Sequence, residues 1–234
     1  MKLKLTSLFL SILGCSIYIN GYAENHNSHN SGHQANYNHT SNTNHTAHNS
    51  HSVHTLNSDD ISAQIANSMH AEMMKTPYSE SGDIEKDYLA NMIPHHQGAI
   101  DSSKILLKYT KNPKLIKIAK NIIKTQEAEV ALFKQILAKK DYTTTKISKQ
   151  EYQNFVNQSK NSMNEMMVAM MVKSSGNIDK DFLISMIPHH QGAIQASYQI
   201  LALTKDKKVK EIAEQIIKEQ QLEIKEFSDL INTL

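Results

Sequence analysis

Residues 92–100 read MIPHHQGAI, and residues 186–194 repeat these nine residues without a change. The same 94-residue offset pairs identical residues in the flanking sequence, which indicates a tandem duplication. These further pairs are Met69 and Met163, Met73 and Met167, Asp87 and Asp181, Gln126 and Gln220, Glu129 and Glu223, and Phe133 and Phe227.

Both copies lie in sequence that has the pattern of α-helices. Glycine and proline are scarce there, and apolar residues recur at spacings of three and four. The expected helices span residues 59–75, 84–110, 113–140, 148–173, 178–204 and 206–232. Three helices of this size make a thin core, so we expect the two sets to pack together or to dimerise as a bundle. The sequence therefore predicts an all-α fold.

The chain is expected to have four segments. Residues 1–23 have the basic start, short apolar stretch and small residues of a signal peptide, with a buried N-terminal helix as the alternative. Residues 24–57 are rich in Asn, Ser, Thr and His and are expected to be disordered. The first helical repeat follows at 58–141 and the second at 146–234.

Cleavage after Ala23 would release an exported, periplasmic protein without a membrane span. The alternative is a lipoprotein anchored through Cys15, because the residues before it resemble a lipoprotein box. Cys15 is the only cysteine, so a chain cleaved after Ala23 has no thiolate ligand and no disulfide. The 25 basic residues are all lysines and are balanced by 23 acidic ones. This composition does not favour nucleic-acid binding.

The repeated segment places soft metal ligands on one helical face. Residues three and four apart share a face, so Met92 lies beside His95 and His96. The second copy arranges its own ligands in the same way: Met186, His189 and His190. Thioether and neutral imidazole together favour copper, above all Cu(I). Di-iron bundles have Glu-x-x-His where this chain has Met-x-x-His, which disfavours an oxygen-activating iron site. The alternative is a pair of ordinary polar-face histidines.

Two further features of the repeat should shape the site. Pro94 and Pro188 fall inside the expected helices, so each helix either restarts or kinks there. Gly98 and Gly192 follow the histidine pairs, and a missing side chain lets another helix approach closely.

The remaining methionines gather on the first helix of each set rather than being scattered as core filler. If these helices form tight hairpins, Met69 lies close to Met92, while Met163 and Met166 lie level with Met186 and His189. We therefore predict that some of them are additional ligands, while others fill the core. The candidates are Met69, Met73, Met163, Met166, Met167 and Met170.

Polar residues interrupt the apolar stripes of the third helices. Gln126 and Glu129 do so in the first repeat, and Gln220 and Glu223 do so in the second. They are candidate partners that orient the metal-binding histidines, and the alternative is a solvated edge.

The tail holds eight histidines in the segment 24–57, which predicts a low-specificity collector of Cu(II), Zn(II) or Ni(II). A spacer with incidental histidines is the alternative. If the mature chain begins Glu24-Asn25-His26, its amine, two amides and the His26 imidazole form a square-planar set for Cu(II) or Ni(II).

The Met-x-x-His-His segments, together with the Gln and Glu pairs on the third helices, resemble the bacterial family called domain of unknown function 305. The resemblance covers residues 59–234 in two copies. It implies a ferritin-like helical bundle, export, and copper handling, since copper-binding periplasmic members are known. His-rich tails are not a general feature of that family.

The sequence thus predicts a periplasmic protein, monomeric or homodimeric, that sequesters or delivers copper and is not an enzyme. Its partners would be metal ions and a copper exporter or cuproprotein. One competing hypothesis is a ferritin-like metal-dependent oxidoreductase, and the other is a metal-free helical interaction module. The repeat leaves open whether the two faces form two metal sites or one composite site.

Overall fold

The computed structural model describes residues 58–171 and 173–234, and these residues form helices and no strand. The all-α prediction is therefore confirmed for this part of the chain. The predicted signal peptide, the predicted tail and His26 lie outside the described residues. The helices are α1 (Ser58–Lys75), α2 (Ile84–Tyr109), α3 (Pro113–Lys139), α4 (Lys149–Ala169), α5 (Ile178–Leu201) and α6 (Lys207–Ile231).

Two helices end earlier than their periodicity suggested, because the residues after them bind elsewhere. The α4 helix stops at Ala169 rather than at 173, and Ser174 and Ser175 then donate hydrogen bonds to Asp181 in α5. The α5 helix stops at Leu201 rather than at 204, and the Thr204 hydroxyl donates to the buried carboxylate of Glu85 at 2.6 Å. These tertiary hydrogen bonds override the local helical pattern.

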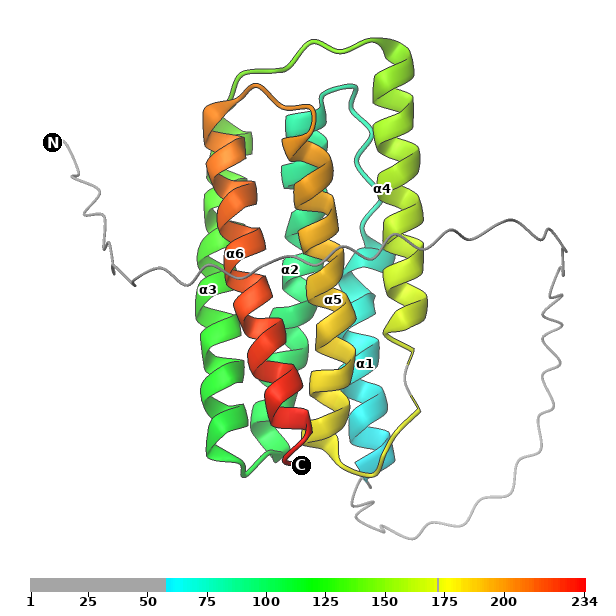
Figure 1. The fold of residues 1–234 in the computed structure, drawn as a ribbon, viewed down its shortest axis with the longest axis vertical. Coiled ribbons are helices and arrows are strands. Elements are labelled where there is room, and N and C mark those ends of the chain that lie inside the picture. The colour runs from blue at the N-terminus through cyan, green and yellow to red at the C-terminus, as the bar shows by residue number, and fades with distance from the viewer. Residues whose placement is uncertain (1–57, 172) are drawn as a thin grey trace, which may run out of the picture. The chain divides into compact units, whose positions relative to one another are not determined.

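The helices form three layers (Figure 1). The middle layer consists of α2 and α5, which run antiparallel and contact each other. On one side α3 packs on α2 and α6 packs on α5, and on the other side lie α1 and α4. The middle helices are therefore covered on both sides, which explains why their central residues are buried. In the described residues, no helix has the length and hydropathy that crossing a membrane requires.

Local sequence signals fix the ends of several helices. Asp83 caps α2 by accepting a hydrogen bond from the Lys86 amide, and Ser148 and Glu151 form a reciprocal capping box at the start of α4. Pro94 and Pro188 are inside α2 and α5, and both helices continue through them. The alternative in which each helix restarts at its proline is therefore wrong.

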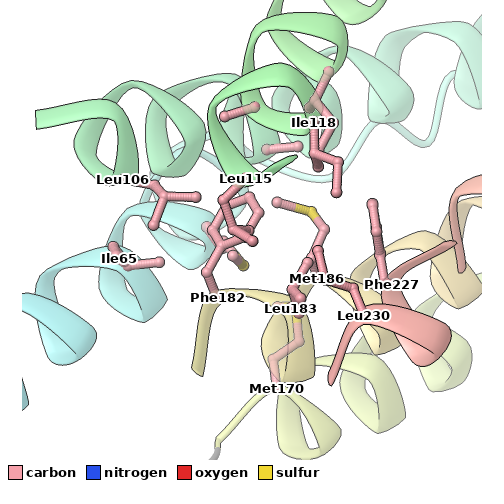
Figure 2. Packing of buried hydrophobic residues seen from close by; sticks show 14 of the residues in the cluster. Ile65, Leu106, Leu115, Ile118, Met170, Phe182, Leu183, Met186, Phe227 and Leu230 are labelled. Carbon is pink, nitrogen blue, oxygen red and sulfur yellow. The ribbon is translucent and has the colours of Figure 1, made fainter. Parts of the chain in front are cut away.

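The apolar core falls into two clusters, one toward each end of the middle helices. In Figure 2, Met186 and Met170 pack with Phe182, Leu183 and Leu115, all fully or almost fully buried. The second cluster joins Tyr88, Leu89, Met92, Phe133 and Phe155, with further residues of α5 and α6. The two equivalent methionines of the repeated segment, Met92 and Met186, thus belong to different clusters.

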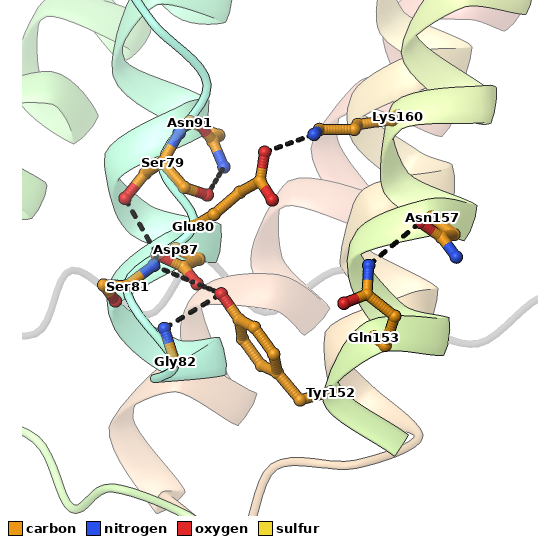
Figure 3. Close-up of polar contacts among 10 residues, drawn as sticks. All are labelled: Ser79, Glu80, Ser81, Gly82, Asp87, Asn91, Tyr152, Gln153, Asn157 and Lys160. Carbon is orange, nitrogen blue, oxygen red and sulfur yellow. Dashed lines mark hydrogen bonds and ion pairs between the residues drawn. The ribbon is translucent and has the colours of Figure 1, made fainter. Parts of the chain in front are cut away.

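A buried aspartate near the start of α2 ties the middle layer to the outer layer. Asp87 accepts hydrogen bonds from the Ser79 hydroxyl and the Ser81 amide, each at 2.8 Å. It also accepts one at 2.7 Å from the hydroxyl of Tyr152 in α4, as Figure 3 shows. An ion pair between Lys160 and Glu80 holds α4 to the same loop.

Asp181 has the equivalent role at the start of α5, where it binds an outer helix and the preceding loop. It accepts from Ser174 and Ser175 at 3.0 Å and from the hydroxyl of Ser62 in α1 at 2.7 Å. Burial alone would raise the pKa of Asp181, but the hydrogen bonds from Ser175, Ser62 and Ser174 outweigh it and lower the pKa. Each outer helix is therefore bound to the middle helix of the other half: α4 to α2, and α1 to α5.

Candidate metal centre

The two middle helices meet through a pair of histidines. The imidazole rings of His95 in α2 and His189 in α5 have centroids 3.9 Å apart and planes inclined by 39°. Both residues are buried. Each ring lies close to the backbone of the other histidine, but none of the four ring nitrogens makes a well-formed hydrogen bond. Buried polar atoms without partners are rare in proteins, so these nitrogens mark a candidate ligand site.

Burial also determines the charge of this pair. Loss of hydration lowers the pKa of His95 and of His189 well below 6.5, and the neighbouring imidazoles lower it further. Both rings are therefore neutral at pH 7. A neutral imidazole has a free lone pair on one nitrogen, which is the form that binds metals.

The second histidine of each pair points toward the layer formed by α3 and α6, where it lies next to a glutamate carboxylate. Nε2 of His96 lies 3.0 Å from Oε2 of Glu129 in α3, at ion-pair distance but without good hydrogen-bond alignment. Nε2 of His190 forms a 2.7 Å hydrogen bond with Oε2 of Glu223 in α6. An ionised carboxylate only accepts, so a neutral imidazole that faces it carries its hydrogen on Nε2 and keeps the lone pair on Nδ1.

The Nδ1 atoms of His96 and His190 are buried and have no hydrogen-bond partner. Phe133 and Phe227 cover these rings at centroid distances of 5.5 and 5.3 Å. A carboxylate on one nitrogen and an open lone pair on the other is the arrangement that orients metal-binding histidines. Chemically, both rings are suited to bind a cation through Nδ1.

The glutamines of the third helices lie one turn from these glutamates. Gln126 and Gln220 are buried, and the side-chain oxygen of each lacks a partner. Glu129 and Glu223 are half-buried and face the histidines. Gln126 and Gln220 therefore do not lie on a solvated edge, whereas Glu129 and Glu223 keep partial contact with solvent.

A cavity of about 320 Å³ leads from the surface to one edge of the histidine pair. It lies between the end of α1, the α1–α2 loop, α2, α4 and α5. His95 lines it together with Met73, Met74, Met92, Met163 and Met166. Tyr88, Ser159 and Gly192 also line it, and periodicity gave no signal for their place there. None of its lining residues is Asp, Glu, Lys or Arg.

Other candidate methionines lie in the core and do not line the cavity, whereas Met166 and Met92 belong to the core clusters and also line it. Met186, Met69 and Met170 are fully buried in the cluster of Figure 2. Met167 is half-buried and packs against the same cluster. The sequence could not distinguish the two groups, because both have the same spacing along their helices.

The hairpin geometry predicted for Met69 is wrong. Its backbone lies against Gly98, and Met92 belongs to the other core cluster. On the second hairpin, Met166 sits over Gly192 rather than level with Met186. The expected tight turns are instead loops with several residues, which shift each outer helix along its partner.

His70 is a candidate that the repeat alone does not identify. It is half-buried, its Nε2 has no partner, and burial lowers its pKa despite contacts with the backbones of Met167 and Ala66. His70 shares a helical face with Met73 and Met74, and this i, i+3, i+4 spacing was the available signal. Among residues 58–171 and 173–234, no three His, Cys, Asp or Glu side chains converge as a metal cluster.

Known proteins resemble this chain in sequence and in fold. A family model described as domain of unknown function (DUF305) matches residues 20–137 and 85–231. The uncharacterized protein L153 of Acanthamoeba polyphaga mimivirus is 44% identical over 54 residues, which span 23% of this chain and 36% of the viral protein. The similarity thus covers about a third of that relative.

Two solved structures are similar to this chain. A silver-bound form of CopM is 25% identical with a TM-score of 0.48, and the match covers 64% of this chain and 95% of CopM. A DUF305 fragment from Deinococcus radiodurans is 20% identical with a TM-score of 0.49, and the match covers 68% of this chain and 98% of the fragment.

Proposed function

The chain belongs to the DUF305 family, and on this premise we propose that it is a copper-binding protein that holds Cu(I) at the histidine pair. The observation that carries the proposal is one cavity in which a neutral, partnerless histidine, His95, meets five methionines. Thioether and imidazole are the ligands that Cu(I) prefers. The absence of carboxylates from the cavity lining makes it a poor site for harder ions.

The proposed centre is composite, because His95 and His189 come from different halves and lie in ring contact. Met92 and Met166 are the most buried of the five cavity methionines, and Met92 lies one helical turn before His95. In the described residues no three His, Cys, Asp or Glu side chains converge, so His96 and His190 would join the centre through Nδ1 only after a local rearrangement, with Glu129 and Glu223 holding their orientation. Met186, Met69 and Met170 remain candidates only if the core rearranges around the ion.

The cellular role we propose is to sequester or deliver copper in the periplasm. The predicted signal peptide and the histidine-rich tail support this role from the sequence alone. The tail, with His26 at the mature N-terminus, would collect Cu(II), and the bundle would hold Cu(I). A copper exporter or a cuproprotein is the proposed recipient.

Anaerobic titration of the full chain with Cu(I) against a competing chelator tests the proposal. Replacing both central histidines (His95→Ala with His189→Ala) should lower the affinity of the tightest site by at least about 100-fold, because two ligands are lost. Glu129→Gln should cost about 10- to 100-fold, as removal of a carboxylate behind a ligating histidine does.

Met171→Leu is the matched control, because Met171 is exposed and does not line the cavity. Its Cu(I) affinity should equal that of the wild type. Unchanged tight binding in the double histidine variant would overturn the proposed site. Oxygen consumption with Cu(I) or Fe(II) would favour an oxidoreductase, and no thermal stabilisation by Cu(I) would favour a metal-free interaction module.

A further inference from the structure

The two sides of the histidine pair are not equally accessible, although the segments that carry it are identical. On the α1 side, Gly98 lies directly under the backbone of Met69, and a Cβ at residue 98 would overlap the Met69 carbonyl. Phe182 and Met186 are fully buried in the same core cluster as Met69. No lining residue of the 320 Å³ cavity comes from this contact.

The α4 side is open. At the equivalent glycine, Gly192, the neighbour is the thioether sulfur of Met166 rather than a backbone. A helix that contacts its neighbour through a side chain lies further from that neighbour than a helix that makes the contact with its backbone. The cavity that reaches His95 lies at this position, between α4, α5 and the end of α1.

The thioethers along this cavity form a graded series from solvent to the site. Met74 is 74% exposed, Met73 and Met163 are half-buried, and Met166 and Met92 are 5% and 3% exposed. His95 lines the same cavity and is 8% exposed. Between the exposed sulfur and the imidazole, the lining offers sulfur donors and no charged side chain.

Such a lining distinguishes cations by chemistry. A hydrated divalent ion must lose water to enter an apolar cavity, and no carboxylate there compensates for that cost. A soft monovalent ion can exchange its ligands for thioethers one at a time.

From this asymmetry we propose that the cavity is a loading route of the histidine pair, on which soft monovalent ions, Cu(I) or Ag(I), pass from Met74 by way of Met73 and Met163 to Met92, Met166 and His95. The outer methionines act in transfer and the inner ones in retention. This inference rests on the proposed function, since it presumes that the histidine pair holds the ion.

A matched pair of exposed methionines tests the route. Met74 and Met171 are 74% and 76% exposed, and only Met74 lines the cavity. The measurement is the rate at which the full chain takes Cu(I) from a coloured chelator complex in stopped flow, with the equilibrium affinity measured in parallel. Leucine is the replacement, because it conserves volume and removes only the sulfur.

Met74→Leu should slow loading measurably, and the triple variant Met73→Leu, Met74→Leu and Met163→Leu should slow it by about one decade. The loading rate should fall by a larger factor than the equilibrium affinity, and Met171→Leu should load at the wild-type rate. Wild-type loading in the triple variant would overturn the route. A lower affinity with an unchanged rate would also overturn it, because the outer methionines would then be static ligands.

The two proposals fail in different ways. If the proposed function is wrong, the variant without His95 and His189 binds Cu(I) as tightly as the wild type, whatever the outer methionines do. If only the route is wrong, that variant loses the site while the leucine variants load normally. Ag(I), which does not change oxidation state, should give the same order of loading rates as Cu(I).

Discussion

Gly98 and Gly192 occupy the same position in two identical nine-residue segments, yet they meet different neighbours. The first accepts the backbone of α1 at Met69, whereas the second accepts the side chain of Met166 from α4. The residue equivalent to Met166 in the first half is Glu72, which is paired with Lys75 near the surface. The difference teaches that the outer helices, and not the repeated segment, decide which face of the site is closed.

The largest expected effect is on the free energy of unfolding and concerns His95 and His189, where the two halves of the molecule should behave alike. Because burial lowers the pKa of His95 and His189, both stay neutral in the folded protein, while the unfolded chain takes up a proton on each below about pH 6.5. Stability should therefore fall as the pH falls. Each histidine should contribute a loss of about 2 kcal/mol in the free energy of unfolding between pH 7 and pH 5.

Urea unfolding followed by circular dichroism at both pH values measures this loss. His95→Gln and His189→Gln should each remove about half of the pH-dependent loss that the pair produces. Unequal effects of the two variants would show that the halves already differ at the centre. Comparing the free energy of unfolding of the same variant at the two pH values cancels the part of the substitution's effect that does not depend on pH.

The next largest effect should separate the two glycines. A Cβ at residue 98 meets the backbone of Met69, so Gly98→Ala forces α1 to move, and overpacking of this kind costs about 1–3 kcal/mol. A Cβ at residue 192 meets the flexible end of Met166, which can move aside. Alanine also favours a helix over glycine by about 1 kcal/mol, so Gly192→Ala should be nearly neutral.

The urea midpoints of the two alanine variants provide the measurement. Equal destabilisation by both substitutions would mean that α4 packs as closely as α1 and that the difference between the two faces does not hold in solution. Gly192→Ala should in addition change the loading rate of Cu(I) more than Gly98→Ala, since only residue 192 lines the cavity.

The smallest effects concern the aspartates that anchor the outer helices. Tyr152→Phe removes the hydrogen bond to Asp87 and also the acceptor of the Gly82 amide, and Ser62→Ala removes one hydrogen bond to Asp181. Hydrogen bonds to charged groups contribute about 1.5–3 kcal/mol. Because each aspartate keeps its other partners, the free energy of unfolding should fall by about 1.5 kcal/mol in each variant.

Amide hydrogen exchange measures the effect of each substitution on its own outer helix. Tyr152→Phe should increase exchange in α4, and Ser62→Ala should increase it in α1. Because the hydrogen bonds lower the pKa of Asp181, the stability they give is present above about pH 4 and lost below it. The cost of Ser62→Ala should therefore shrink near pH 3, and a cost that persists there would contradict this assignment.

Much of the fold follows from local signals. Apolar spacing and capping residues such as Asp83 and Ser148 define the helices within a few residues, because helix formation depends on neighbours along the chain. The shared face of His95 and His96 also follows from spacing alone. So does the position of Glu129 on the inner stripe of α3, which made it a candidate partner of the histidines and which places its carboxylate 3.0 Å from His96.

The sequence could not predict how the outer helices slide along the middle ones. Met69 was expected near Met92 because a tight turn was assumed, whereas the loop between α1 and α2 is bound by Asn91 and Asp87 and displaces the helix. For the same reason the sequence does not indicate which methionines line the cavity and which lie only in the core. Packing between segments far apart in the chain decides it, and repeated spacing does not encode it.

The crossed anchors of α1 and α4 have a consequence for the chain as a whole. With α4 bound to Asp87 and α1 bound to Asp181, neither set of three helices contains all the partners of its own aspartate. If the two sets were separate molecules, these bonds would form only after a bimolecular encounter. The short linker between α3 and α4 replaces that encounter with an effective concentration on the order of millimolar, so the assembly of the site does not depend on how much protein the cell makes.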